Sequence, residues 1–319
     1  MPAVGDLRQR LMALADDSVP GNAEICRLCA YRLSLGGSEH RQELAAMISG
    51  QHAQALGIPA AQHSVIARLL HSLLTRLPGG FDLRGACIGN LMLAGGYLES
   101  ERNLQDAVTV FSELVSARGV VLPVVSDNAH LFIELENGRS IIGQHELTGK
   151  ETLPIESPVR HLSLSRHAER YEPTKVVLGD CNRNLIESAD LICFAPGSFY
   201  SSLIATLLPE GVGSAIGANP APKVFVPNLG VDPEQLGMSF QQSVSVLLSH
   251  LIQGAAHVEP VDVLTHVITD VEHGLYPSPV NRAELRELGI ELIDLRLVTP
   301  HSSPYYDNAK LLQALLSLS

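Results

Sequence analysis

The spacing of apolar residues divides the chain into a helical part and a part in which strands and helices alternate. In residues 43–56 and 62–77 apolar positions recur every three or four residues, which predicts amphipathic helices. Short unbroken apolar runs instead predict strands that are buried on both faces, as in a parallel sheet between helix layers. We expect such strands at residues 120–125, 191–195, 223–226, 263–268 and 290–297.

Helical periodicity returns between and after these runs, at residues 181–189, 240–253, 282–288 and 309–316. This alternation predicts an α/β fold with a Rossmann-like, doubly wound and mostly parallel sheet. Asn137-Gly138 is a strong two-residue hairpin signal between two β-like runs, so we expect an antiparallel excursion there. The expected organisation is one α/β domain over residues 1–319, with a helical insertion at residues 20–80.

The central apolar run ends at Pro196-Gly197-Ser198 and resumes at once with helical spacing. A strand, a tight turn and a helix N-terminus in this order place free N–H groups and a favourable dipole at the carboxyl edge of the sheet. Hydroxyl groups follow at Tyr200, Ser201 and Ser202, which suggests a phosphate seat. The same residues could merely close the loop and cap the helix.

The amino-acid sequence of this turn excludes two familiar catalytic loops. It has no lysine, as a P-loop requires, and Ser198 lacks the second glycine of a G-x-S-x-G nucleophile elbow. Polar residues also follow two other expected strands: Asp127 and Asn128 after residues 120–125, and Asn228 after residues 223–226. They either face a ligand or only turn the chain.

Composition narrows the classes of partner. The formal net charge of −12 and the lack of a dense Lys/Arg run argue against nucleic acid. An anionic ligand must then be held by backbone N–H groups, a few arginines or a divalent metal. No apolar run approaches a membrane span and the N-terminus does not resemble a signal peptide, so we expect a cytoplasmic protein. The five cysteines suit reduced thiols, and no second pair completes a zinc site with Cys26 and Cys29.

Six motifs occur in an order that resembles the family joining the 2-phospho-L-lactate transferases (CofD) with the gluconeogenesis-factor proteins (YvcK). They are PAVGDLR with the following LMALAD, the Gly89-Asn90-Leu91 turn, RGVVLPVVSDNAHLFIELENG, ADLICFAPGSFYSSLIATLL, APKVFVPNLGVDPEQLGMS and the tail through YYDNAKLLQALL. Within the family the chain is most similar to the CofD-like proteins of the GAK system. The resemblance implies a Rossmann-like core, a phosphorylated, nucleotide-linked ligand and a possible homodimer.

The resemblance also implies site residues and a chemistry. One branch of the family moves a phospholactyl group from a guanosine diphosphate-linked donor with magnesium, and the other binds a UDP-sugar and regulates. Asp6 and Asp127 are the candidate catalytic carboxylates, either of which could hold Mg²⁺ or receive a proton, with Asp127 as the candidate metal ligand. The candidate ligand and phosphate contacts are Gly5, Arg8, Gly89, Asn90, Asn128, Gly197, Ser198, Tyr200, Ser201, Ser202 and Asn228.

One part of the family pattern is missing. Its members begin with two strands and a glycine-rich loop before the stretch that matches residues 2–8, and this chain has no such segment. We therefore hypothesise that Met1 is an internal methionine and that the natural product is longer by about two β-α units.

Three functions remain open. The first is a CofD-like transferase that uses a nucleotide diphosphate-linked donor, and the second is a YvcK-like nucleotide-binding regulator without catalysis. The third is a structural subunit that has lost its site together with its N-terminus.

Overall fold

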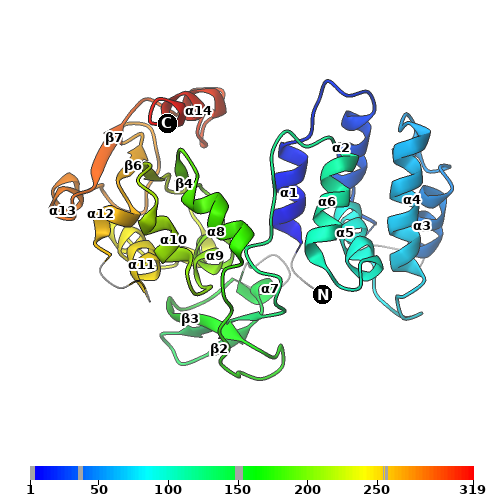
Figure 1. Ribbon diagram of the computed structural model, residues 1–319, viewed down its shortest axis with the longest axis horizontal. Helices are drawn as coiled ribbons and strands as arrows, with labels where there is room; N and C mark the ends of the chain where they lie inside the picture. The colour runs from blue at the N-terminus through cyan, green and yellow to red at the C-terminus, as the bar shows by residue number, and fades with distance from the viewer. Residues whose placement is uncertain (1–3, 35–38, 148–153, 254, 256–257) are drawn as a thin grey trace. The chain divides into compact units, whose positions relative to one another are not determined.

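The computed structural model describes residues 4–34, 39–147, 154–253, 255 and 258–319. Residues 1–3, which include Met1 and the first two residues of the first family motif, lie outside this part. The chain divides into two compact units, Met1–Ser126 and Asp127–Ser319, and each is treated by itself below. The strands β1 to β7 all belong to the second unit (Figure 1).

The first unit is built from helices that the apolar spacing largely anticipates. They bury one continuous core to which each long helix contributes, for example Leu11, Ile25, Ile66 and Phe111. The helices are α1 (Gly5–Ala13), α2 (Asn22–Ala30), α3 (His40–Ile48), η1 (Ala53–Ala55), α4 (Ala60–Leu74), α5 (Ile88–Glu99) and α6 (Leu104–Leu114).

Helices α4 and α5 approach each other closely because α5 carries glycine at the crossing. A Cβ atom on Gly95 would lie 1.9 Å from the carbonyl oxygen of Leu69, so only glycine fits. This close packing fixes α5, whose N-terminus carries two of the predicted ligand residues.

The second unit contains a parallel sheet with the strand order β4-β5-β6-β7. All three pairings are parallel. The strands are β4 (Ile192–Phe194), β5 (Lys223–Phe225), β6 (His266–Thr269) and β7 (Glu291–Asp294). This is the Rossmann-like α/β fold expected from the alternating pattern, and the predicted strands at these four places are confirmed.

Helices connect and follow these strands. Val224 and Ile268 of the sheet share a core cluster with Ala314 of the last helix, so that helix covers one face of the sheet. The helices are α7 (Gln144–Leu147), α8 (Asp180–Glu187), η2 (Phe199–Ile204), α9 (Ala205–Leu207), α10 (Val212–Ala218), η3 (Pro233–Gln235), α11 (Phe240–Ile252), α12 (Pro260–Val263), α13 (Arg282–Glu287) and α14 (Asn308–Leu316). Within the described residues, no helix is long and apolar enough to cross a membrane.

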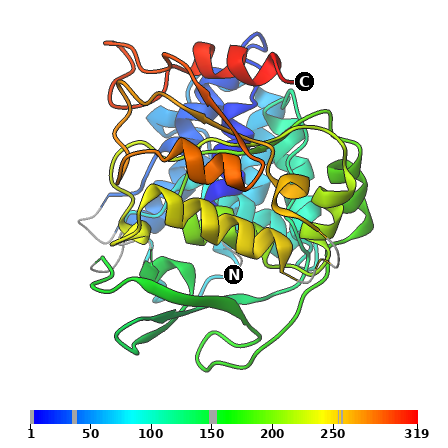
Figure 2. The same ribbon diagram turned by 90° about the vertical axis from the view of Figure 1, so that its left-hand side faces the viewer.

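The antiparallel excursion is also present. β1 (His130–Leu135) pairs with β2 (Ser140–Ile142) around the Asn137-Gly138 turn, and β3 (Val159–Ser165) pairs with the other edge of β1. Figure 2 shows this small sheet in green below the yellow helix α11, on the side away from the red helix α14.

One local expectation was wrong, and two local details were not anticipated. Residues 120–125 do not form a strand, and Val120 is 74% exposed, so Asp127 and Asn128 do not follow a strand end. Gly5, a candidate ligand contact, begins helix α1. The helix after Ser198 opens with a π-helical turn, because the Leu203 N–H reaches back to the Ser198 carbonyl oxygen at 3.1 Å.

Candidate functional site

The carboxyl ends of the four parallel strands define one candidate region in the second unit. Because the strands are parallel, the loops that follow them leave the same edge of the sheet. These loops are residues 195–198, 226–230, 270–276 and 295–299. They carry the glycine-serine turn and Asn228, both predicted from sequence, and also Asp270 and His273, which were not.

Asn228 ties the loop after β5 to the turn after β4. Its Oδ1 accepts a hydrogen bond from the Gly197 N–H at 2.8 Å, and its Nδ2 donates to the Gly197 carbonyl oxygen at 2.6 Å. The same amide nitrogen lies 3.1 Å from Oδ2 of Asp232. Asn228 and Gly197 are therefore brought together as predicted, but their polar groups bond to each other.

The N–H groups at the start of η2 are bound by carboxylates of the chain itself. The Phe199 N–H donates to Asp232 at 3.0 Å, and the Tyr200 and Ser201 N–H groups both donate to Oε2 of Glu234 at 2.8 Å. The Ser201 hydroxyl donates to Oε1 of Glu234 at 2.5 Å. These donors do not face an open anion site, and a phosphate at this turn is left with Ser198 and with the open face of Gly197, whose N–H is bound to Asn228.

Burial also separates the residues of this turn that are closed to a ligand from those that are open to one. Tyr200 and Ser201 are 3% and 6% exposed, and Glu234 is 2% exposed. Burial raises the pKa of Glu234, although the hydrogen bonds from Ser201 and Tyr200 work in the opposite direction. Burial, followed by the nearby Glu234, raises the pKa of Tyr200 to about 12. In contrast, Gly197 is exposed, and Ser198 and Ser202 are partly exposed.

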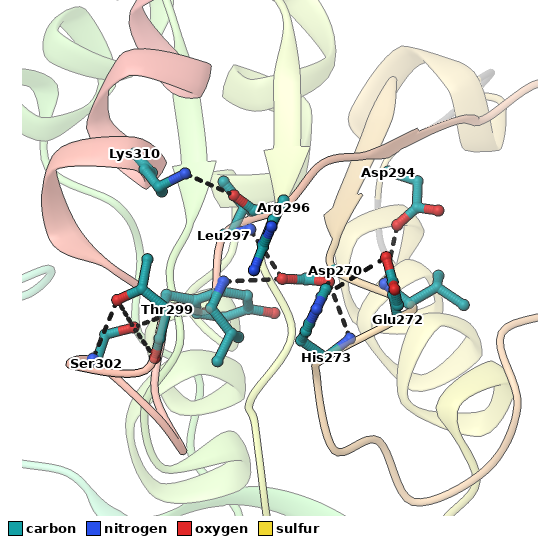
Figure 3. Close-up of polar contacts among 12 residues, drawn as sticks. Asp270, Glu272, His273, Asp294, Arg296, Leu297, Thr299, Ser302 and Lys310 are labelled. Atoms are coloured by element: carbon teal, nitrogen blue, oxygen red, sulfur yellow. Dashed lines mark hydrogen bonds and ion pairs between the residues drawn. The ribbon is translucent and has the colours of Figure 1, made fainter.

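Asp270 and His273 form a second polar cluster at the same edge, directly after β6 (Figure 3). Asp270 is 2% exposed and accepts backbone hydrogen bonds from His273, Leu297 and Val298. Its Oδ1 also lies 3.1 Å from Nδ1 of His273. Burial alone would raise the pKa of Asp270, but these hydrogen bonds together lower it.

This geometry fixes the hydrogen on the His273 ring. An ionised carboxylate only accepts hydrogen bonds, so Nδ1 of His273 donates to Asp270, and in a neutral ring Nε2 is then an acceptor. The His273 side chain is 32% exposed, so the ring is reachable from solvent. The available sequence signal was an acidic residue directly after a strand, with a histidine three positions later.

The first unit holds a separate cluster at the N-terminus of α5. Arg8 is only 9% exposed, its guanidinium contacts Sγ of Cys87, and its Nε has no hydrogen-bond partner among the described residues. A Cβ atom on Gly89 would lie 2.7 Å from Cδ of Arg8, so the arginine stem packs directly on this glycine. The structure thus brings together Arg8 and Gly89, which were predicted from the family resemblance.

The start of α5 is uncapped where Arg8 meets it. Cys87 at the N-cap provides no side-chain hydrogen bond, and in the described part of the chain the Gly89 and Asn90 N–H groups find no acceptor. Oδ1 of Asn90 is also buried without a partner there. A buried cation beside the positive end of a helix is unfavourable unless an anion is present.

The remaining predicted residues lie at exposed places. Gly5 and Asp6 are in the first turn of α1, with Asp6 exposed, and Asp127 and Asn128 are exposed in the segment before β1. Among the residues that the structure describes, no three His, Cys, Asp or Glu side chains come together in a way that could hold a metal ion. Mg²⁺ often takes only one or two carboxylates and completes its shell with substrate phosphates and water.

Comparison with known proteins gives consistent results. The model of the family described as 2-phospho-L-lactate transferase CofD matches residues 1–298. The gluconeogenesis factor of Bacillus subtilis (strain 168) is 29% identical over 231 residues, which are 70% of this chain and 68% of that protein. A putative gluconeogenesis factor of Thermotoga maritima is 30% identical over 178 residues, which are 56% of this chain and 52% of that protein. These matches span between about half and two thirds of the relatives.

A solved structure shows the same fold. A UPF0052 family protein from Bacillus halodurans superimposes with a TM-score of 0.61 and 20% sequence identity, over 93% of this chain and 96% of that chain. At this level of identity, the likeness concerns the fold.

Proposed function

The chain belongs to the 2-phospho-L-lactate transferase CofD family, and on this premise we propose that it transfers a phospho-organic group of the 2-phospholactyl type from a nucleotide diphosphate-linked donor. In this reaction an acceptor hydroxyl attacks the donor phosphorus, the phosphoanhydride bond breaks, and a nucleoside monophosphate leaves. The protein's task is to spread the phosphate charge and to orient the attacking hydroxyl.

The observation that carries the proposal is the uncompensated charge of Arg8. An unpaired buried cation costs several kcal/mol, and the N-terminus of the twelve-residue helix α5 adds to that cost. A phosphate between the guanidinium and the Gly89 and Asn90 N–H groups would remove both penalties and use the bidentate geometry that arginine offers. We assign the donor's phosphate to this place, with Gly5 in the adjoining first turn of α1.

The second unit carries candidate phosphate contacts of its own. Gly197 and Ser198 remain the proposed phosphate contacts at the carboxyl edge, with Ser202 and Asn228 near them. Gly197 accepts a close approach because nothing lies within 4 Å of the position that a Cβ atom would take. The Asp232 and Glu234 carboxylates behind the turn limit this contact to its exposed side.

For proton transfer and magnesium the proposal rests on three side chains. Asp6 in the first unit or Asp127 in the second is an exposed carboxylate that could bind Mg²⁺ together with donor phosphates, and Asn128 follows Asp127 in the sequence. His273, held by Asp270, is a base whose Nε2 can accept the hydroxyl proton. Mg²⁺ would neutralise the developing charge on the transferred phosphoryl group.

The alternative is a binding regulator that holds a UDP-sugar or another nucleotide without turnover. What favours it is the name gluconeogenesis factor, which the curated relatives carry. The two functions share the Arg8 seat and differ only in chemistry.

The experiment therefore measures binding and turnover together. The protein is incubated with Mg²⁺, a deazaflavin alcohol as the acceptor, and either guanosine diphosphate-linked lactate or UDP-sugars, and we expect thermal stabilisation by the bound nucleotide and release of GMP from the lactate donor. Stabilisation without GMP release would instead support the regulator. Absence of both binding and turnover would refute the proposed phosphate site at Arg8.

Two variants localise the binding. Arg8→Gln should weaken nucleotide binding by about a hundredfold, the loss of a charge-assisted bidentate contact. Arg10→Gln is the matched control, since Arg10 is exposed on the same helix. Asn90→Asp should stabilise the fold, because its carboxylate supplies the missing anion, and should abolish binding for the same reason. Ser198→Asp tests the second contact: unchanged affinity would mean that the turn at Gly197 is structural.

A further inference from the structure

A cavity in the second unit lies apart from the carboxyl edge. Its volume is about 760 Å³, within the range of small-molecule sites, and it lies between β3 and the helices α8, α10 and α11. His250 and Gln253 line it at the end of α11. This helix follows the carboxyl end of β5 and ends before β6 begins, so the cavity lies on the amino side of the sheet.

The walls of the cavity are largely apolar. β3 contributes Leu162 and Leu164, and the chain after α9 contributes Leu208 and Pro209. Leu162 and Pro209 are buried, which gives the cavity a fixed floor. Such walls accept a compact organic body, and the polar groups at the rim then decide what kind of molecule binds.

The charged rim is positive on balance. Lys175 is compensated by Glu210 at 2.5 Å, but Arg183 has only Glu187 at 3.9 Å among its described partners, beyond hydrogen-bond distance. The Arg183 guanidinium lies over Gly211, where a Cβ atom would be 2.8 Å from its Nη2. Gly211 has φ +96°, a backbone conformation that favours glycine. The N–H groups of the Arg183 guanidinium thus lie at the cavity and make little use of acceptors within the described part of the protein.

Two histidines complete the rim. Nδ1 of His250 lies 2.9 Å from the Val246 carbonyl oxygen and must donate to it, so Nε2 of the neutral ring is an acceptor for a ligand hydroxyl. His161 on β3 lines the same cavity. Because burial lowers the pKa of His250, Arg183 supplies the positive charge at this rim.

We propose that this cavity is a second binding site, separate from the nucleotide seat, for a small organic anion whose carboxylate or phosphate pairs with Arg183. The apolar body of the ligand would lie against Leu162 and Pro209. Occupation would bridge the small antiparallel sheet and the helices of the parallel sheet, and would thereby hold these two parts of the second unit together.

The test is calorimetric titration with benzoate and with phenyl phosphate, which separate the carboxylate and phosphate sources of the same charge. Benzyl alcohol is the neutral comparison. At least one anion should bind with a dissociation constant at or below about 1 mM, and benzyl alcohol should bind more weakly. Arg183→Gln should reduce the affinity about tenfold or more. Arg282→Gln is the control, because Arg282 is exposed and already pairs with Asp294 at 2.6 Å.

Two further variants make the result decisive. Ser214→Trp adds bulk from an exposed position of α10 that lines the cavity, and it should abolish anion binding with the fold intact. Arg8→Gln should leave this binding unchanged, so the two proposed sites can fail independently. If neither anion binds, or if both Arg183→Gln and Ser214→Trp bind like the unmodified protein, the second site does not exist.

Discussion

Replacing Asp270 by asparagine tests whether the carboxyl edge depends on one buried anion. Asp270 accepts three backbone N–H groups and the His273 ring, through both of its oxygen atoms. Asparagine keeps one oxygen and turns an NH₂ group toward donors that the other oxygen served. Each orphaned buried donor costs about 1–3 kcal/mol, so the two backbone donors to Oδ2 predict a loss near 3 kcal/mol.

The measurement is urea denaturation of Asp270→Asn at neutral pH. Glu272→Gln is the matched control, since the Glu272 side chain is 85% exposed in the same loop and its loss should cost almost nothing. The effect of Asp270→Asn should appear as a lower midpoint with an unchanged slope. A loss no greater than that of Glu272→Gln would refute the reasoning, because Asp270 would then contribute nothing as an acceptor.

The pH dependence gives a second check with a defined sign. The hydrogen bonds lower the pKa of Asp270 below its ordinary value of 3.8, so its contribution is present above that pH. It is lost as the pH falls through the lower, folded-state pKa. The difference between the protein and Asp270→Asn should therefore stay constant from about pH 7 to about pH 5 and shrink only under more acidic conditions.

Three other substitutions test the packing and the buried charges by the same denaturation assay. Gly95→Ala should cost about 3 kcal/mol because of its contact with Leu69, whereas Gly79→Ala, with open space around it, should be close to neutral; equal effects would contradict the helix crossing. Glu234→Ala should cost about 3 kcal/mol, since it strands two N–H groups and a hydroxyl, and a neutral result would mean that η2 is capped in some other way. Burial lowers the pKa of Lys223, partly opposed by Asp262, so the charge opposes folding and stability should rise with pH. Lys223→Met should accordingly stabilise the protein by about 1 kcal/mol at neutral pH and by less at alkaline pH, and a destabilised variant would show that the ammonium group is well compensated.

Much of the fold could be predicted from the sequence because secondary structure depends on the local pattern of apolar and turn residues. The runs that became β4, β5, β6 and β7 are short and unbroken, and the Asn137-Gly138 turn specifies its hairpin by backbone conformation alone. Residues 120–125 failed because an apolar run alone does not make a strand. A strand also needs a neighbouring strand in the right register, and the tertiary structure decides whether one is there.

The carboxyl edge shows what the local sequence does not determine. The turn at Gly197 was correctly placed, but whether its N–H groups are free depends on Asp232 and Glu234, more than thirty positions later in the chain. A capped helix N-terminus and an open one have the same local sequence, because the capping group here comes from another loop. Asp270 and His273 are only three residues apart, and closer attention to strand ends would have found them.

The sequence by itself determined the alternation of strands and helices, the hairpin, the family and the residue types that can bind an anion. The tertiary structure decided which of those groups are already satisfied. It buried Arg8 against Cys87, 79 positions away, with no counter-charge among the described residues, and it bound the N–H groups of η2 to carboxylates of the chain itself. The physical reason is that hydrogen bonds and charges are compensated across space, so the balance at each site depends on partners that the local sequence does not name.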